Sequence, residues 1–492
     1  MILRVIGHNF HYEMENLCRV FFPDEKIKTV YNKNEGNEDK IVTTIFIKKE
    51  QTVNLTVEVQ LGNAVNMCSC AVDINHNNLL AECERQMAVA LFDSMVYLTG
   101  YIPSWGILTG VRPSKLMINL IKQCGEEGAA SYFRNDLLVS SEKTNLAITV
   151  ANAEAGIISR ARKNCFSLYV SIPFCPSRCS YCSFVSHSIT AVNARKLLPE
   201  YIENLFFELK KIGKIASMLG INPQTIYFGG GTPTSLEATD LERICKAIGK
   251  NFNLSYLDEY TVEAGRPDTI TKEKLTTLKN NGVTRISINP QTFNDDVLEA
   301  IGRKHTSECT LKAYNLARLV GFESINMDLI AGLPKDSLEG FSNTLEISRN
   351  LAPENITVHT LALKRSSSLV TQGEKIFDCG KTAEMLNLAQ NKLPISGYHP
   401  YYMYRQSRSV GNLENIGWCK PGYEGIYNVF MMEECQTVLS AGAGAVTKLK
   451  EKNGSHIERI FNFKYPYEYN SRFSELIERK KAISEFFSKY NV

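Results

Sequence analysis

The hydrophobic and polar positions follow two rhythms along the chain. Residues 40–49 and 52–60 are apolar-rich or alternating stretches that predict strands, and a helical pattern follows over residues 79–101. From Phe166 onward, short apolar stretches alternate with longer stretches of helical periodicity. This change predicts a structural boundary near residue 160.

The second rhythm predicts six strands joined by helices. The strands are expected at Ser167–Ser171, Thr225–Phe228, Tyr260–Ala264, Thr284–Ile288, Ser324–Ile330 and Ile356–Leu361. The helices are expected near Ala191–Ile215, Thr239–Lys250, Thr271–Asn280, Ser307–Val320 and Leu338–Asn350. Strands joined by helices predict an α/β fold with a parallel sheet, either doubly wound or a partial or full barrel. In both arrangements ligands bind at the carboxyl ends of the strands.

Composition places the chain among ordinary globular proteins. It has 492 residues, 44% of them hydrophobic and 22% charged, with 55 basic and 52 acidic side chains, which excludes a disordered or collagen-like chain. The net charge of +3 does not favour nucleic-acid binding. No apolar run reaches the roughly 18 residues of a membrane span, and the first residues turn polar too soon for a signal peptide. We therefore expect a soluble, cytoplasmic protein without a membrane span.

The chain contains 14 cysteines. In a reducing compartment these are expected as thiols or metal ligands rather than disulfides. Most are isolated and are interpreted as small buried hydrophobes. Cys68 and Cys70 lie two apart in a predicted strand and are also interpreted as structural. Three remain, and they are clustered: Cys175, Cys179 and Cys182.

This triad directly follows the first strand of the second region, as Cys175-Pro-Ser-Arg-Cys179-Ser-Tyr-Cys182. Thiolates are the usual ligands of iron–sulfur clusters, and this spacing lets one loop surround a cubic cluster. Three thiolates leave one of the four irons open to a substrate or cofactor. The alternatives are a zinc knuckle, with His187 as a fourth ligand, or three cysteines together by chance.

A glycine-rich loop follows the second strand as Gly229-Gly-Gly-Thr-Pro233. Glycines permit close approach of a ligand to the backbone. Polar residues also occur within, at or beyond later strands, namely Glu263, Gln291, Arg303 and Asp328. Each taken singly is typical of a surface or capping residue, but together they fall where α/β proteins hold ligands.

These stretches resemble the radical S-adenosylmethionine (SAM) superfamily and, within it, the oxygen-independent coproporphyrinogen III oxidase family, in its HemZ-type branch. The resemblance covers about residues 165–450. It is carried by the cysteine triad and by Leu168–Cys175, Phe228–Thr234, Ser287–Phe293, Asn326–Pro334, Asn412–Gly422 and Gly442–Ala445. The N-terminal region, including Gly110–Ser114, resembles the HemZ-type branch alone.

The resemblance implies a partial (β/α)6 barrel at residues 161–375, preceded by an α+β domain at 1–160 and followed by a small C-terminal region at 376–492. It implies that Cys175, Cys179 and Cys182 hold a [4Fe–4S] cluster whose fourth iron chelates SAM. The positions it implies for SAM contacts are Tyr169, Tyr181, Gly230, Gly231, Thr232, Glu263, Gln291, Arg303, Asp328 and Ala362.

The implied activity is oxidative decarboxylation of two propionates of coproporphyrinogen III, giving protoporphyrinogen IX in heme biosynthesis. The electron donor would be a protein such as flavodoxin or ferredoxin. A tetracarboxylate tetrapyrrole needs basic partners and a broad apolar face. The candidates are Lys364, Arg365, Arg405 and Arg408, with Tyr401, Tyr402 and Tyr404; the alternative is a solvated basic loop.

Two features depart from the family pattern. Decarboxylating members carry a further cysteine two residues after the triad, where this chain has Phe184, as in the heme chaperones of the family. Only 44 residues follow Lys448, so we expect either that the substrate-covering C-terminal domain is missing or that the N-terminal region takes over its task. The alternatives are therefore a heme chaperone on the same scaffold, radical modification of another tetrapyrrole, and a zinc-binding structural protein.

Overall fold

A computed structural model describes residues 1–23, 25–32, 38–182, 184, 187–362, 378–406 and 409–490. Its contacts group the chain into two compact units. The first unit comprises Met1–Asn152 and Met403–Glu414, and the second comprises Ala153–Tyr402 and Asn415–Val492. Lys364, Arg365 and Arg408, proposed from the sequence as substrate contacts, lie outside the described residues.

The first unit is built on a five-stranded sheet in the order β2-β1-β3-β4-β5. β1 is parallel to both neighbours, whereas β3, β4 and β5 form an antiparallel meander. Alternate residues of β4 are buried, as its sequence pattern predicts. The elements are β1 (Ile2–Ile6), α1 (His11–Phe21), β2 (Lys28–Val30), β3 (Lys40–Lys48), β4 (Thr52–Leu61), β5 (Ala64–Asp73), α2 (Leu79–Thr99), α3 (Pro113–Ser131) and α4 (Ser141–Ile158).

A buried ion pair ties the two segments of the first unit together. Lys143 Nζ lies 2.6 Å from Glu414 Oε1, and both side chains are almost inaccessible to solvent. Trp105 Nε1 donates to the other carboxylate oxygen of Glu414 at 2.6 Å. With Lys143 and Trp105 as partners, the buried carboxylate is satisfied.

Most of an eleven-stranded sheet belongs to the second unit, and the centre of this sheet is six parallel strands in chain order. These are β6 (Cys165–Ile172), β9 (Asn222–Gly230), β10 (Glu259–Glu263), β11 (Arg285–Ser287), β12 (Ser324–Ala331) and β13 (Asn355–Thr360). Every one overlaps a strand predicted from the sequence. The fold is a mixed α/β fold with a partial (β/α)6 arrangement.

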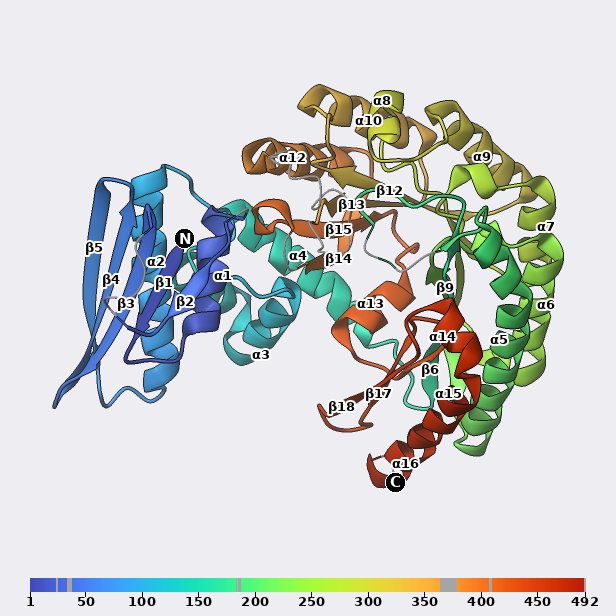
Figure 1. Cartoon of the computed structure of the whole chain (residues 1–492), viewed down its shortest axis with the longest axis horizontal. Coiled ribbons are helices and arrows are strands. Elements are labelled where there is room, and N and C mark those ends of the chain that lie inside the picture. Colours follow the sequence, from blue (N-terminus) through green and yellow to red (C-terminus); the bar gives the residue numbers. More distant parts are fainter. Residues whose placement is uncertain are drawn as a thin grey trace. The chain divides into compact units, whose positions relative to one another are not determined.

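Helices connect these strands and form an outer layer around them (Figure 1). They are α5 (Val192–Met218), α6 (Ala238–Asn251), α7 (Lys272–Asn280), α8 (Asp295–Ala300), α9 (Ser307–Val320), α10 (Leu338–Leu351) and α12 (Cys379–Ile395). Local capping explains several boundaries: the side chains of Thr271, Thr306 and Ser337 accept backbone N–H groups at the starts of α7, α9 and α10. Gly321, in the left-handed conformation, ends α9.

The C-terminal residues extend both edges of the parallel core. β15 runs antiparallel to β13, and β16 runs parallel to β6. The remaining elements are β14 (His399–Arg405), β15 (Glu414–Cys419), α13 (Ile426–Glu433), β16 (Val438–Ala441), β17 (Val446–Lys450), β18 (Ile457–Phe461), α14 (Pro466–Ser471), α15 (Phe473–Arg479) and α16 (Lys481–Tyr490). Among the described residues, no helix combines the length and apolar character needed to cross a membrane.

Candidate functional site

The cysteine loop leaves the carboxyl end of β6. Cys175 lies in β7 (Phe174–Cys175), which pairs in parallel with β8 (His187–Ser188). Backbone bonds hold the segment at both ends: Ile189 N donates to Cys175 O at 2.8 Å, and Ser180 N donates to Ile301 O at 3.0 Å. The loop is therefore anchored to two other parts of the second unit.

The three thiols lie close enough to influence one another. Burial raises the pKa of the Cys182 thiol to about 11, and the neighbouring thiols of Cys179 and Cys175 add to the rise. Thr232 Oγ1 donates to Cys175 Sγ at 3.5 Å. Thiols held together in this way favour a metal centre, because a cation stabilises the thiolates that burial disfavours.

Arg266 fixes the stretch between the first two cysteines and is not among the residues identified from the sequence. It is 3% exposed. Its Nη1 donates to Ser177 Oγ at 3.0 Å and lies 3.9 Å from Cys179 Sγ, while its Nε and Nη2 each bond Asp268 at 3.0 Å. The only sequence signal for Arg266 is its position just beyond the third strand.

The glycine loop packs directly against the residues that precede Cys175. Gly231 N donates to Ile172 O and Thr232 N donates to Phe174 O, both at 2.8 Å. A Cβ placed on Gly231 would meet Phe174 O at 2.6 Å, and Gly230 has a φ of 101°. Glycine is required at both positions, one for close approach and one for its backbone conformation.

Two carboxylates with different electrostatics lie on β10 and β12, two parallel strands of the second unit that are separated by β11. Burial raises the pKa of Glu263 to about 7, although the Tyr227 hydroxyl donates to Glu263 Oε1 at 2.5 Å. Burial also acts on Asp328, but hydrogen bonds, first of all from His359, outweigh it and hold the pKa of Asp328 below its usual value. At neutral pH Asp328 is ionised and Glu263 is about half ionised.

Two further predicted contacts are buried with unused hydrogen-bonding atoms. Gln291 is 6% exposed and has a φ of 67°. Its Oε1 has no hydrogen-bond partner among the described residues, and the same holds for Nε of Arg303. Arg303 Nη1 donates to Asn289 O at 2.6 Å, and its guanidinium adjoins Tyr181 and Cys179. Strained backbone and unpaired buried polar atoms are typical of a ligand site.

Stacked tyrosine rings form one side of the region around Glu263. Tyr227 and Tyr427 stack with ring centroids 4.4 Å apart, and Tyr169 lies 6.3 Å from each. Tyr427 comes from α13, far along the chain from β6 and β9. Among these three rings, only that of Tyr169 was predicted from the sequence as part of the site, and that prediction came from the family resemblance.

The remaining predicted residues are more dispersed. Ala362 follows the end of β13, and Phe184 is 60% exposed. Tyr401 and Tyr402 are buried with ring centroids 4.8 Å apart. Tyr404 and Arg405 belong to the first unit.

Arg405 is 2% exposed and makes its observed contacts within the first unit. Its Nη2 donates to Gly110 O, and its guanidinium carbon lies 5.0 Å from the Trp105 ring centroid. Burial lowers the pKa of Arg405 to about 9. The residues it contacts include the Gly110–Ser114 segment that resembles the HemZ-type branch.

Comparisons with known proteins identify the class to which this fold belongs. The radical SAM superfamily model matches residues 169–347. The solved coproporphyrinogen III oxidase HemN of Escherichia coli superposes with a TM-score of 0.51 at 22% identity, covering 70% of this chain and 82% of that one, which shows the shared fold. The fold and the cysteine loop thus define a radical SAM enzyme.

Comparison with sequence relatives identifies the family to which the chain belongs within this superfamily. The chain is 34% identical over 489 residues to the oxygen-independent coproporphyrinogen-III oxidase-like protein HemZ of Bacillus subtilis, covering 97% of this chain and 96% of that protein. It is 35% identical over 240 residues to the heme chaperone HemW of the same organism, covering 48% of this chain and 62% of the chaperone. The chain belongs to the radical SAM superfamily and, within it, to the HemZ family.

The cofactors of this superfamily are a [4Fe–4S] cluster and SAM, and the residues present fit both. Three thiols on one loop, two of which act electrostatically on the third, match the cluster. The unpaired Oε1 of Gln291 and Nε of Arg303, with the closely packed glycine loop, match a polar ligand. Family membership decides against the zinc alternatives, including the one with His187.

Proposed function

We propose that this protein decarboxylates two propionates of coproporphyrinogen III to yield protoporphyrinogen IX in the cytoplasm. The observation that carries the proposal is the similarity to HemZ over 97% of the chain, whereas the match to the chaperone HemW covers 48%. The site supports it with three adjoining thiols beside a glycine loop at the carboxyl end of β6 and β9.

When bound and reduced, the cluster and SAM supply the one-electron chemistry that removes hydrogen from an unactivated carbon. The thiols of Cys175, Cys179 and Cys182 hold the cluster. Arg266 orients their loop through its bonds to Ser177.

The polar residues of the site bind SAM in this proposal. The backbone of Gly230–Thr232 permits close approach of the methionyl part, and Arg303 pairs with a carboxylate. Glu263 and Asp328 accept hydrogen bonds from ammonium or hydroxyl groups. Gln291, Tyr181 and Ala362 complete the proposed contacts, and the stacked Tyr169, Tyr227 and Tyr427 exclude water beside them.

The proposed substrate contacts are Lys364, Arg365, Arg405 and Arg408, which carry charges complementary to the carboxylates of a tetrapyrrole. Arg405 is the one member within the described residues. Its Nε and Nη1 lack a hydrogen-bond partner among those residues. An arginine with unused donors suits a carboxylate partner.

A second candidate function is heme binding and transfer. It is favoured by Phe184, whose exposed ring stands where decarboxylating relatives carry cysteine, and by the match to the chaperone HemW. A planar porphyrin stacks readily on an exposed aromatic ring.

The experiment is anaerobic incubation of the cluster-reconstituted protein with SAM, coproporphyrinogen III and reduced flavodoxin or ferredoxin. We expect release of carbon dioxide and a product with two vinyl groups, both abolished by Cys179→Ala. Cys124→Ala, which removes an exposed cysteine outside the triad, serves as a matched control and is expected to leave the rate within a few-fold. SAM cleavage without carbon dioxide would reject this substrate. Stoichiometric heme capture and transfer would then support the chaperone, and a product gaining a methyl group would indicate modification of another tetrapyrrole.

A further inference from the structure

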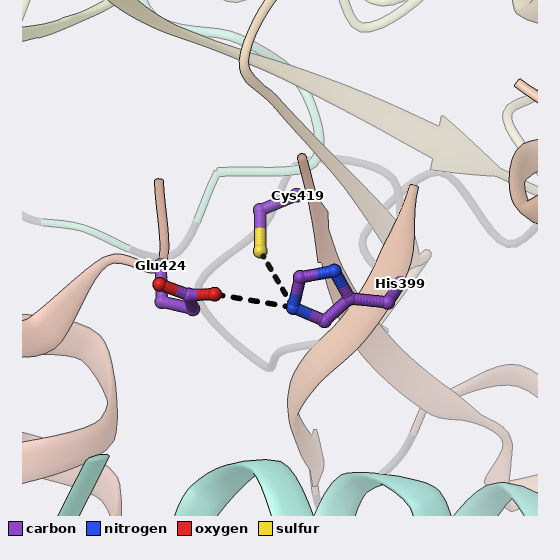
Figure 2. A group of neighbouring side chains, drawn as sticks. All are labelled: His399, Cys419 and Glu424. Atoms are coloured by element: carbon purple, nitrogen blue, oxygen red, sulfur yellow. Dashed lines mark hydrogen bonds and ion pairs between the residues drawn. The ribbon is translucent and has the colours of Figure 1, made fainter. Parts of the chain in front are cut away.

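A second group of metal-ligating side chains lies away from the cysteine loop. His399 begins β14, Cys419 ends β15, and Glu424 precedes α13. Figure 2 shows the three side chains pointing toward one another. Because Cys419 pairs with Asn355, the first residue of β13, the group lies at the amino ends of the parallel strands. The cysteine loop lies at their carboxyl ends, so the two sites occupy opposite ends of the sheet.

The donor atoms of the three residues converge on one point. Cys419 Sγ lies 3.4 Å from His399 Nε2, and Glu424 Oε1 lies 3.2 Å from the same nitrogen. All three donor atoms fall within 4.8 Å of one another. A tetrahedral zinc ion with ordinary bond lengths separates sulfur from nitrogen by about 3.6 Å and nitrogen from oxygen by about 3.4 Å. The two distances from His399 Nε2 are close to those of one ion, and the sulfur and the carboxylate oxygen, within 4.8 Å of each other, need at most a small side-chain movement to share it.

The contacts do not suit a nucleophilic cysteine–histidine–carboxylate relay. Such a relay uses both ring nitrogens, one for the thiol and one for the carboxylate. Here both partners meet Nε2 of His399. One nitrogen cannot accept from a thiol and donate to a carboxylate at the same time. A cation satisfies all three groups together, because each then donates a lone pair.

We propose that His399, Cys419 and Glu424 bind a divalent cation of the zinc class, independently of the iron–sulfur cluster. One sulfur, one nitrogen and one oxygen ligand suit borderline-soft zinc better than magnesium or calcium. A thiolate and a carboxylate together neutralise the charge of a divalent ion. Three protein ligands leave a fourth position for water or an exogenous ligand.

The surroundings support such a site. Cys419 is fully buried, whereas the side chains of His399 and Glu424 are 35% and 18% exposed, which leaves a route for the ion from solvent. Gly422 N donates to Glu424 Oε1 at 3.2 Å and orients the carboxylate. The bound ion would fasten the start of β14 to the end of β15 and protect the Cys419 thiol from oxidation.

The test uses the full-length chain carrying Cys175→Ala, Cys179→Ala and Cys182→Ala, so that the cluster thiols cannot bind the added metal. We expect one zinc ion per chain after dialysis, and a sulfur-to-metal charge-transfer band when cobalt(II) replaces zinc. Cys419→Ser should abolish that band. His399→Ala and Glu424→Gln should each weaken zinc binding by about tenfold or more, because even the loss of an outer-shell partner costs that much.

His456→Ala is the matched control. His456 Nε2 lies 3.1 Å from Glu458 Oε1 in an exposed pair, and both are about half exposed. We expect this variant to bind zinc like the parent. Two results would overturn the proposal: equal zinc binding by the parent and by Glu424→Gln, or no zinc retained by the parent. Neither result depends on whether Cys419→Ser folds. Iron content and SAM cleavage of the cluster-bearing protein are read separately, so failure here leaves the proposed decarboxylation untouched.

Discussion

Replacing Glu263 with glutamine is expected to remove the pH dependence that this carboxyl group imparts to SAM binding. Burial raises the pKa of Glu263 to about 7, above the usual range for a glutamate. An acid with a raised pKa gains its negative charge only as the pH rises through that value. In the proposed role, the ionised form accepts a hydrogen bond from SAM more strongly than the neutral form. Affinity should therefore increase from about pH 6 to about pH 8.

The size of the expected difference in SAM affinity follows from the fraction of Glu263 that is ionised at each pH. With a pKa of about 7, Glu263 is about one-tenth ionised at pH 6 and about nine-tenths ionised at pH 8. A hydrogen bond to a charged group contributes about 1.5–3 kcal/mol, which corresponds to a preference of about tenfold or more for the ionised form. Weighting a tenfold preference by these fractions gives the wild type an advantage over Glu263→Gln of about ninefold at pH 8 and about twofold at pH 6.

The assay is anaerobic equilibrium dialysis of SAM against the cluster-reconstituted proteins at both pH values. SAM and the other titratable groups of the protein are the same in both measurements. Their effects on affinity therefore cancel when the wild-type affinity is divided by the variant affinity at the same pH. Glu242→Gln, which alters an exposed glutamate of α6 paired with Lys246, serves as the matched control and should leave the ratio at one. An advantage for Glu263 that is the same at both pH values would refute the reasoning.

Three further changes test other parts of the structure. Gly231→Ala brings a Cβ to 2.6 Å from Phe174 O and should weaken SAM binding by about 1–3 kcal/mol in dialysis, whereas Gly249→Ala, with nothing within 4 Å, should not. Arg266→Lys loses the paired bonds to Asp268 and should lower the iron bound per chain after reconstitution by about half or more, measured by iron and sulfide analysis. Glu414→Gln removes the carboxylate charge that faces the buried Lys143 ammonium and should destabilise the first unit by about 3–5 kcal/mol, seen as faster amide hydrogen exchange there.

Each of these has a contrary outcome. Equal SAM affinity in Gly231→Ala and Gly249→Ala would show that the glycine loop does not shape the cofactor site. Full iron content in Arg266→Lys would show that the arginine does not position the cysteine loop. Unchanged exchange in Glu414→Gln would mean that water reaches Lys143.

The strands and helices of the parallel core could be predicted because each is specified by the order of its own residues. The expected helix at Ser307–Val320 agrees with α9 at both ends. The apolar run at Ser324–Ile330 lies within β12. Buried parallel strands and amphipathic helices carry their periodicity locally, and capping residues mark their ends. The cysteine triad could also be predicted, because the spacing of three cysteines within one loop is a local property of the sequence.

Other features depend on residues brought together from distant parts of the chain. β16 pairs with β6 although some 270 positions separate them, and Tyr427 of α13 stacks on Tyr227 of β9. Neither backbone pairing between strand edges nor ring stacking produces a periodic pattern in the sequence of either segment, so the partners could not be predicted. The strands and helices predicted from the sequence end at Leu361, before either of these two C-terminal elements.

The residue types available at the proposed SAM site were evident from the sequence by itself, as was the cluster chemistry. The tertiary structure decided their electrostatics: Glu263 and Asp328 are both acidic, yet burial raises one pKa and hydrogen bonds lower the other. It also decided that Arg266 reaches the cysteine loop and that His399, Cys419 and Glu424 meet at one point. Desolvation and the convergence of donor atoms arise only when separate segments pack together, so no local pattern specifies them.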